Sequence, residues 1–308
     1  MKKWLKIAII IFTAVLGLSL LLYPSISNYL YSRNHRHTID DYTSAVSELD
    51  PVSYEVQLDA ARDFNRRLVE TSFYPELPEK DLAEYETLLN FAGNGVMGYL
   101  DVPAADVHLP IYHGTGDAVL QTGVGHLNGT SLPVGGVGMH TVLTGHRGLP
   151  SARLFTDLDR LDLGDTFSLT VLSEVLTYGV DQILSVAPYE IEALAPVEGE
   201  DYCTLVTCTP YGVNTNRLLI RGHRIETPSD EVVAPSKPQA APAAASDRGI
   251  DPVIWILIGL AVAAAAIVIS LVLLLRTKQP GTNTKSDPKS AAKPGATPAK
   301  KPGRFLKK

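Results

Sequence analysis

Cysteine is scarce in this chain, because its 308 residues include only Cys203 and Cys208. The two lie five positions apart in an apolar, strand-like run. An extended chain separates them by roughly 16 Å and points them to opposite faces, far beyond the reach of a disulfide bond. This excludes a disulfide-stabilised scaffold, so each thiol is either buried and inert or accessible and reactive.

The sequence also lacks the spacing of a metal site and any internal repeat. No pair among the eight histidines combines close spacing with a nearby third ligand, as a zinc site would require. No segment recurs at a period typical of solenoid proteins. We therefore expect no metal, no cofactor and a globular domain without repeats.

Positive charge is scarce in the central part of the chain. The formal charge of -6 hides an uneven distribution, since three basic residues precede Ile7 and ten follow Leu275. Between Pro24 and Pro252, 14 Lys or Arg face 32 Asp or Glu, which leaves a formal charge near -18. Such a field argues against nucleic acid as a partner and fits an exported soluble domain.

Two long apolar runs flank this acidic region. The first, Ile7 to Tyr23, comes after three lysines and is about long enough to cross a membrane with a few flanking residues. It predicts a membrane anchor or a cleavable signal peptide over residues 1–28, and either would export the acidic region. The second, Val253 to Leu275, has no charge in 23 residues and predicts a transmembrane helix.

The segments on either side of the second run have different compositions. Residues 227–252 are rich in Pro, Ala and Ser, a composition that predicts a spacer because it cannot bury enough apolar area to offset chain entropy. Residues 276–308 carry ten basic residues and one acid, so the positive-inside rule predicts a cytoplasmic tail. We therefore expect a protein of the cell membrane with Thr38 to Arg248 outside the cell.

Between the two membrane segments, the apolar periodicity changes near Asn94. Before it, apolar residues recur at spacings of three and four, which predicts a preface of two helices over residues 38–94. The helices are separated at Ser72–Lys80, where two prolines prevent a continuous helix. Residues 95–226 contain short β-branched and aromatic runs between Gly, Pro, Asp and Asn turns, which predicts a mainly β sandwich or closed barrel. The seven runs are Val96 to Val102, Val107 to Tyr112, His140 to Thr144, Thr166 to Leu172, Val175 to Val186, Cys203 to Thr207 and Leu218 to Ile225.

One segment of the β region combines a thiol with a cation. Cys208 ends an apolar run, and after a turn that contains proline and glycine, Arg217 begins the next one, so a hairpin would bring them together. A nearby cation favours the reactive thiolate, and a guanidinium can donate to an oxygen that becomes negative during acyl transfer. The residues alone leave another interpretation open, with Cys208 as a small buried residue and Arg217 as a surface charge.

A cysteine acyltransferase also needs a base, and we rank His146 first among the histidines. It comes after another β-rich run in VLTGHRGLP, at a glycine-flanked turn where an imidazole can project into a cleft. A lone histidine is more often structural or on the surface than catalytic, so spacing alone does not decide its role.

These segments resemble the sortase family of cysteine transpeptidases. TLVTC, which ends at Cys208, is followed nine residues later by Arg217 as in the sortase signature, and residues 146–165 resemble the region around the sortase catalytic histidine. Three further segments are similar to class C, the pilus-assembling sortases: PIYHGT (110–115), GVGHLNGTSLPVGG (123–136) and DYCTLVTCTPYGVNTNRLLIRGHR (201–224). The similarity covers about residues 60–226.

The resemblance implies a closed, eight-stranded β-barrel and a thioacyl intermediate on Cys208. Cys208 would attack the Thr carbonyl of an LPxTG-like sorting signal, which is cut between Thr and Gly. His146 would protonate the leaving amine and later deprotonate the incoming one, while Arg217 would stabilise the oxyanion. Thr207 is a candidate for shaping the oxyanion pocket, and equally an ordinary strand residue.

The implied partners are pilins or surface proteins that carry such sorting signals. Class C sortases typically transfer the pilin to a lysine amine of the next pilin, whereas a housekeeping sortase joins the protein to cell-wall peptide. A surface β-domain on a stalk is the non-enzymatic alternative. Such a protein would carry LPxTG directly before its terminal helix, but here SDRGIDP precedes that helix, and the similar string LPVGG (132–136) is internal.

Two features depart from the class C pattern. Class C sortases usually have a lid with Asp-Pro followed by an aromatic residue, and the lid-like loop at residues 70–82 contains no such triplet. The one Asp-Pro of the preface begins at Asp50, before the helix that should precede the lid. We expect Phe73 or Tyr74 to cover the thiol instead, and we interpret Cys203, an unusual residue at its position, as a packing residue.

Overall fold

The computed structural model describes residues 3–70 and 77–227. Phe73 and Tyr74, nearly all of the predicted spacer, the predicted helix at 253–275 and the predicted tail at 276–308 lie outside the described residues. The chain divides into two units, Met1–Ile11 with Ile256–Lys308, and Phe12–Trp255. In the first unit the described residues are helical, and in the second they form helices and a β-barrel.

Three helices precede the barrel: α1 (Lys3–Ser47), α2 (Pro51–Glu70) and α3 (Glu79–Tyr85). Within α1, the span Ile9–Ser47 contains a window of mean hydropathy 2.2, none of which is buried. By length and composition, this helix could cross a membrane. The segment predicted as an anchor or export signal is therefore the apolar start of one long helix.

The sequence predicted two helices over residues 38–94, but three helices contribute to this segment. α1 ends at Ser47, and Asp50 caps the next helix, because its Oδ1 accepts hydrogen bonds from the backbone N–H groups of Val52 and Ser53, both at 3.0 Å. Pro51 suits the first position of α2, where its missing N–H needs no partner. These hydrogen bonds, led by that from the Ser53 hydroxyl, lower the pKa of Asp50. The Asp-Pro pair of the preface therefore begins a helix.

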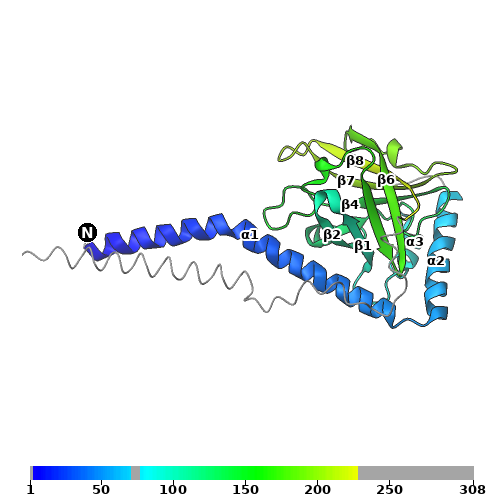
Figure 1. The fold of residues 1–308 in the computed structure, drawn as a ribbon, viewed down its shortest axis with the longest axis horizontal. Coiled ribbons are helices and arrows are strands. Elements are labelled where there is room, and N and C mark those ends of the chain that lie inside the picture. Colours follow the sequence, from blue (N-terminus) through cyan, green and yellow to red (C-terminus); the bar gives the residue numbers. More distant parts are fainter. Residues whose placement is uncertain (1–2, 71–76, 228–308) are drawn as a thin grey trace, which may run out of the picture. The chain divides into compact units, whose positions relative to one another are not determined.

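Eight strands close into a barrel, as the resemblance implied, and their order is β1-β2-β3-β4-β7-β8-β6-β5. Figure 1 shows the strands with α2 beside them. Their bounds are β1 Val96–Val102, β2 Val107–His113, β3 Val124–His126, β4 Met139–Thr144, β5 Thr166–Val171, β6 Glu174–Val186, β7 Asp201–Thr209 and β8 Asn216–Arg224. Short helices interrupt the connections: η1 Pro103–Ala105, α4 Asp117–Thr122, η2 Leu158–Arg160 and η3 Glu192–Leu194. The sequence pattern missed only β3, because three residues cannot show an alternating pattern.

Two strand pairs are parallel, and they set the position of the site. β3 lies parallel to β2, and β7 lies parallel to β4, whereas the other neighbours are antiparallel. Parallel neighbours need a crossover connection, and α4 lies in the one between β2 and β3. The pairing of β4 with β7 brings together two segments about sixty residues apart in the sequence.

Buried polar contacts attach the preface to the barrel. The Tyr42 hydroxyl of α1 donates to the Met97 carbonyl at 3.0 Å and accepts from the Leu172 N–H at 2.7 Å. Asn65 of α2 exchanges two hydrogen bonds with the Leu132 backbone, at 2.7 and 3.0 Å. A buried polar group without a partner is costly, so these bonds fix how α1 and α2 pack on the strands. The preface and the barrel interior share one hydrophobic core.

Candidate active site

Cys208 and Arg217 lie directly opposite each other where β7 and β8 form a hairpin. Directly opposed residues of neighbouring strands share a face of the sheet, with Cβ atoms about 5 Å apart. Both residues are partly exposed. The hairpin predicted from the sequence is therefore present and pairs the two residues, and Nη1 of Arg217 donates to the Asn216 carbonyl at 3.2 Å.

Cys203 lies on the same strand but faces the other way. It is 0% exposed, belongs to the barrel core and has no disulfide partner. Burial, with a smaller effect from Asp201, raises the pKa of the Cys203 thiol well above its usual value. A thiol that stays protonated is a poor nucleophile, so Cys203 is a packing residue and Cys208 is the reactive candidate.

His146 comes after β4 at the same level of the sheet as Cys208. The parallel register pairs Thr144 of β4 with Val206 of β7, and His146 and Cys208 each lie two residues further along. Gly145, next to the histidine, donates its N–H to the Val206 carbonyl at 3.1 Å. The Phe155 N–H donates to the His146 carbonyl at 3.0 Å. The first bond holds the backbone before His146 next to the strand that carries the thiol, and the second joins His146 to the loop that follows it.

Thr207 contributes to this arrangement differently from the role considered for it in an oxyanion pocket. Successive residues of a strand point to opposite faces, and Thr207 is 2% exposed on the face opposite to Cys208. Its hydroxyl donates to the Gly145 carbonyl at 2.8 Å. The observed contact therefore positions the loop that carries His146.

The glycines around His146 are required by close packing. A Cβ at Gly145 would lie 2.8 Å from the Phe155 ring, closer than side-chain carbons approach one another. Gly148 has φ +78°, in the left-handed region that favours glycine, and a Cβ there would lie 3.1 Å from the Tyr211 ring. The GHRG motif thus lets the histidine loop lie against both Phe155 and the turn after Cys208.

Sequence reasoning missed Arg147, which links this loop to its surroundings. Its side chain is 6% exposed, forms an ion pair with Asp159 and lies over the Tyr211 ring, 5.7 Å from the centroid. Tyr211 belongs to the turn directly after Cys208. A buried cation needs an anionic partner, and the acidic residues shortly after GHRGLP were the signal that could have indicated one.

The outer face of the sheet next to Cys208 is apolar. Val206 is two residues before Cys208 on that face, and Val186 of β6 lies opposite Arg217. Both pack in a small cluster outside the barrel core, together with Leu194 of η3. A peptide acyl group that reaches the thiol would therefore lie along an apolar surface.

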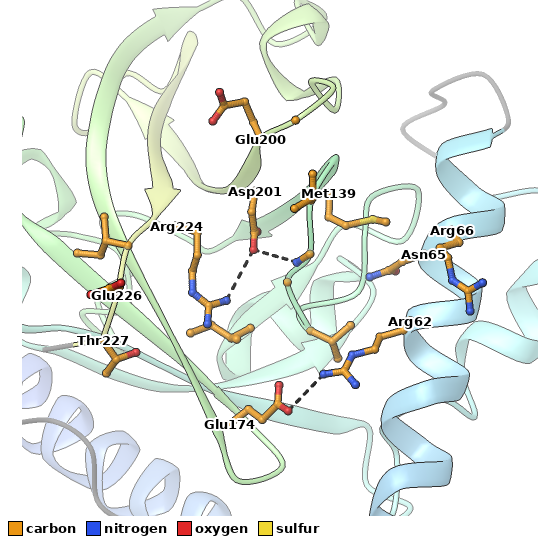
Figure 2. Close-up of a pocket in the computed structure, with 17 residues that line it drawn as sticks. Arg62, Asn65, Arg66, Met139, Glu174, Glu200, Asp201, Arg224, Glu226 and Thr227 are labelled. Carbon is orange, nitrogen blue, oxygen red and sulfur yellow. Dashed lines mark hydrogen bonds and ion pairs between the residues drawn. The ribbon is translucent and has the colours of Figure 1, made fainter. Parts of the chain in front are cut away.

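A pocket lies at the start of β7 (Figure 2). It measures about 900 Å³ and is lined by α2 and by the first residues of β7, including Asp201. Asp201 precedes Cys208 by seven residues, which corresponds to roughly 23 Å along a strand. Two ion pairs lie within its lining, since Arg224 lies 3.7 Å from Asp201 and Arg62 lies 3.3 Å from Glu174. The pocket is therefore separate from the thiol.

The groups at the Cys208 end of β7 suit acyl transfer. A thiol can attack a carbonyl, a guanidinium can stabilise the resulting oxyanion, and an imidazole can move the proton. Within residues 3–70 and 77–227, no group of three His, Cys, Asp or Glu could hold a metal ion. The residue types at this end of β7 are those that nucleophilic catalysis by a cysteine requires.

Known proteins share both the sequence and the fold of this site. The family model described as the Sortase domain matches residues 100–225. The crystal structure of sortase C1 from Streptococcus agalactiae is 46% identical, with a TM-score of 0.61, and the match covers 62% of this chain and 100% of that chain. For sortase C of Streptococcus pneumoniae, the identity is 43% and the TM-score 0.56, with 62% and 97% covered.

Sequence comparison with curated proteins gives a more distant match. A sortase A of Streptococcus agalactiae serotype III is 30% identical over 135 residues, which are 43% of this chain and 54% of that protein. The chain therefore spans about half the length of this relative. The matches to the two sortase C structures cover nearly all of those chains, so they show the family to which this chain belongs.

Proposed function

Because this chain belongs to class C of the sortase family, the cysteine transpeptidases, we propose that it joins pilins to one another. The substrate would be a pilin with an LPxTG-like sorting signal, cut between Thr and Gly. The acceptor would be a lysine amine of another pilin. The pilin substrate named for the pneumococcal sortase C, which is 43% identical, supports this choice.

The proposed reaction has two halves. In the first, the Cys208 thiolate attacks the Thr carbonyl carbon, Arg217 donates to the oxyanion, and the imidazolium of His146 protonates the Gly amine as the peptide C–N bond breaks. In the second, the acceptor amine attacks the thioester, passes its extra proton to His146 and displaces the Cys208 thiolate. The enzyme ends each cycle in its starting state.

The observation that carries this proposal is the register of β4, β7 and β8 around three residues. Cys208 of β7 pairs with Arg217 of β8, and His146 lies two residues beyond Thr144 of β4, which pairs with Val206 of β7; these registers support the proposal. Three separate elements carry these residues, and the backbone of the histidine loop is hydrogen-bonded to β7. Such an arrangement is what a thioacyl mechanism needs.

We further propose that the catalytic domain is held outside the cell at the membrane surface. The apolar part of α1, the uncharged run at 253–275 and the basic tail at 276–308 support this topology. Pilin precursors with their own apolar tails would be anchored in the same membrane. Tethering both partners raises their effective concentration.

The test is polymerisation of a candidate pilin by cells or membranes that carry the full chain. We expect a ladder of covalent products on a denaturing gel that is lost in Cys208→Ala, kept in Cys203→Ala, and lost when one pilin lysine is replaced. The two cysteine variants form a matched pair, since both remove a thiol from the same strand. Products that join pilin only to wall peptide, whatever the pilin lysines, would instead establish a housekeeping sortase.

A further inference from the structure

His140 joins three elements on the outer face of the sheet. It lies in β4 and is 1% exposed. Its Nε2 is 2.7 Å from Oγ1 of Thr204 on β7, and its Nδ1 is 3.0 Å from the carbonyl oxygen of Ala195, directly after η3. A carbonyl oxygen only accepts, so Nδ1 carries the proton, and Nε2 accepts from the Thr204 hydroxyl. One neutral tautomer satisfies both hydrogen bonds.

The burial of His140 keeps this tautomer in place at neutral pH. Loss of hydration lowers the pKa of His140 to about 4, an effect that outweighs the hydrogen bond to Ala195. Arg221, the nearest cation, acts in the same direction, and Asp181 acts against it. The guanidinium of Arg221 is bound by Asp181 and lies over the Tyr202 ring, which in turn contacts the His140 ring.

The segment between β6 and β7, residues 187–200, is the element that His140 holds. Among the hydrogen bonds of the described residues, those of 187–199 otherwise stay within the segment. At its end, the Glu200 carbonyl accepts from the Gly138 N–H at 2.6 Å. The His140–Ala195 bond is therefore the polar contact that fixes the middle of the segment to the sheet.

This segment borders the surface next to the reactive thiol. Leu194 and Ala193 of η3 pack in the cluster that includes Val206 and Val186. Val206 lies two residues from Cys208 on the same face. The segment thus forms a wall of the apolar surface on which an acyl donor would lie. His140 itself is remote from the reaction, since Thr204 is four residues, about 13 Å, from Cys208 along the strand.

We propose that His140 is a positioning residue that sets the affinity for the acyl-donor peptide by fixing residues 187–200 through the Ala195 carbonyl. The inference rests on the proposed function, in which a sorting-signal peptide reaches Cys208 along this face. It predicts an effect on peptide binding and little effect on the chemical step, because His140 contacts none of the reacting groups.

Two isosteric substitutions separate the roles of the two ring nitrogens. In His140→Asn, the side-chain amide nitrogen takes the place of Nδ1 and can still donate to Ala195. In His140→Gln, the amide lies near the place of Nε2 and the donor to Ala195 is lost. With the detergent-solubilised full chain and a sorting-signal peptide, we expect His140→Gln to raise KM about tenfold with kcat within about twofold, and His140→Asn to stay near the parent protein.

Hydrogen exchange of the same samples without peptide gives a readout that does not depend on catalysis. We expect faster exchange across residues 187–200 in His140→Gln and not in His140→Asn. Equal effects of the two substitutions on KM and exchange, or unchanged exchange in His140→Gln, would overturn the proposal. If His140→Gln does not fold, His140→Leu provides a second test, since it keeps a buried side chain of similar size and removes the donor to Ala195; exchange in 187–200 should rise, and no rise would overturn the proposal.

Failure of the proposed function would look different. In that case the parent protein would show no Cys208-dependent cleavage of the peptide, while the exchange difference between His140→Gln and His140→Asn would persist.

Discussion

At the scale of single residues, the two thiols of β7 lie on opposite faces of the strand, one buried and one partly exposed. Cys203 faces the core, where burial raises its pKa, and Cys208 faces outward beside Arg217. Thr207 between them faces inward and holds the His146 loop through Gly145. The alternation of a β-strand thus separates a packing thiol, a positioning hydroxyl and a nucleophile within six residues.

This assignment predicts how substitutions affect cleavage of a sorting-signal peptide. Cys208→Ala should abolish cleavage, and His146→Ala should nearly do so, because the nucleophile and its proton carrier are lost. Arg217→Lys should lower kcat by about 10²-fold, since an ammonium keeps the charge but not the planar pair of donors. Cys203→Ala is the control and should retain most activity; a loss comparable to that of Cys208→Ala would contradict the assignment.

At the scale of elements, the loop between α2 and α3 departs from the class C pattern, because it lacks the Asp-Pro-aromatic triplet. It joins two helices that pack on the barrel, and Leu77 at its end is buried in the shared core. We propose that its aromatic residues Phe73 and Tyr74 cover Cys208 in place of the usual lid triplet. The two prolines restrict the conformations of the loop, which favours such a cover.

The lid proposal predicts the reactivity of the thiol toward a small alkylating reagent. Replacing both Phe73 and Tyr74 by alanine should raise the rate at which Cys208 is modified several-fold. Substitution is preferable to deletion of Ser72–Lys80, which would remove the buried Leu77 and the first residues of α3. An unchanged rate in the double variant would mean that the segment is an ordinary loop.

At the scale of the whole molecule, two buried histidines tie distant parts together as neutral groups. His126 lies 3.0 Å from the Tyr85 hydroxyl of α3 and 2.8 Å from the Ser131 carbonyl, and burial lowers its pKa to about 4. His140 has the same depressed pKa of about 4. Both must remain uncharged for the preface, the barrel and the segment 187–200 to keep their contacts.

These histidines predict how the free energy of unfolding depends on pH. A histidine with a folded pKa near 4 and an unfolded pKa near 6.5 stabilises the protein fully above pH 6.5, and this contribution is lost as the pH falls toward 4. The loss is at most about 3 kcal/mol per histidine. Burial is the main cause that raises the pKa of Asp201, so the contribution of this carboxyl to the free energy of unfolding rises as the pH falls. Denaturant unfolding of the solubilised protein between pH 7 and 4.5 checks this, and constant stability would contradict it.

The charge distribution predicts the topology of the whole chain. Protease added to intact cells should cut the exported part and leave the tail at 276–308 protected, because its ten basic residues favour the cytoplasmic side. A tag at the C-terminus would report the protected fragment, and permeabilised cells serve as the control. Removal of the tag from intact cells would show that the positive-inside argument fails for this protein.

The local pattern of the sequence was sufficient for much of this protein. Alternating runs indicated seven of the eight strands, and two apolar runs joined by a short turn indicated the hairpin that pairs Cys208 with Arg217. Both are local features, since a hairpin brings together residues only a few positions apart. The helix break at Asp50 also has a local sequence signal, because a capping residue is followed there by proline.

Only the tertiary structure decided the rest of the site. His146 reaches the level of Cys208 because β4 and β7 pair in parallel across about sixty residues, a register that no local periodicity contains. The same pairing places Thr207 beside Gly145, and Arg147 of the same loop lies over the Tyr211 ring. Parallel neighbours need a crossover connection, and β5 and β6 lie in the one between β4 and β7, so these side chains become neighbours only through the tertiary fold.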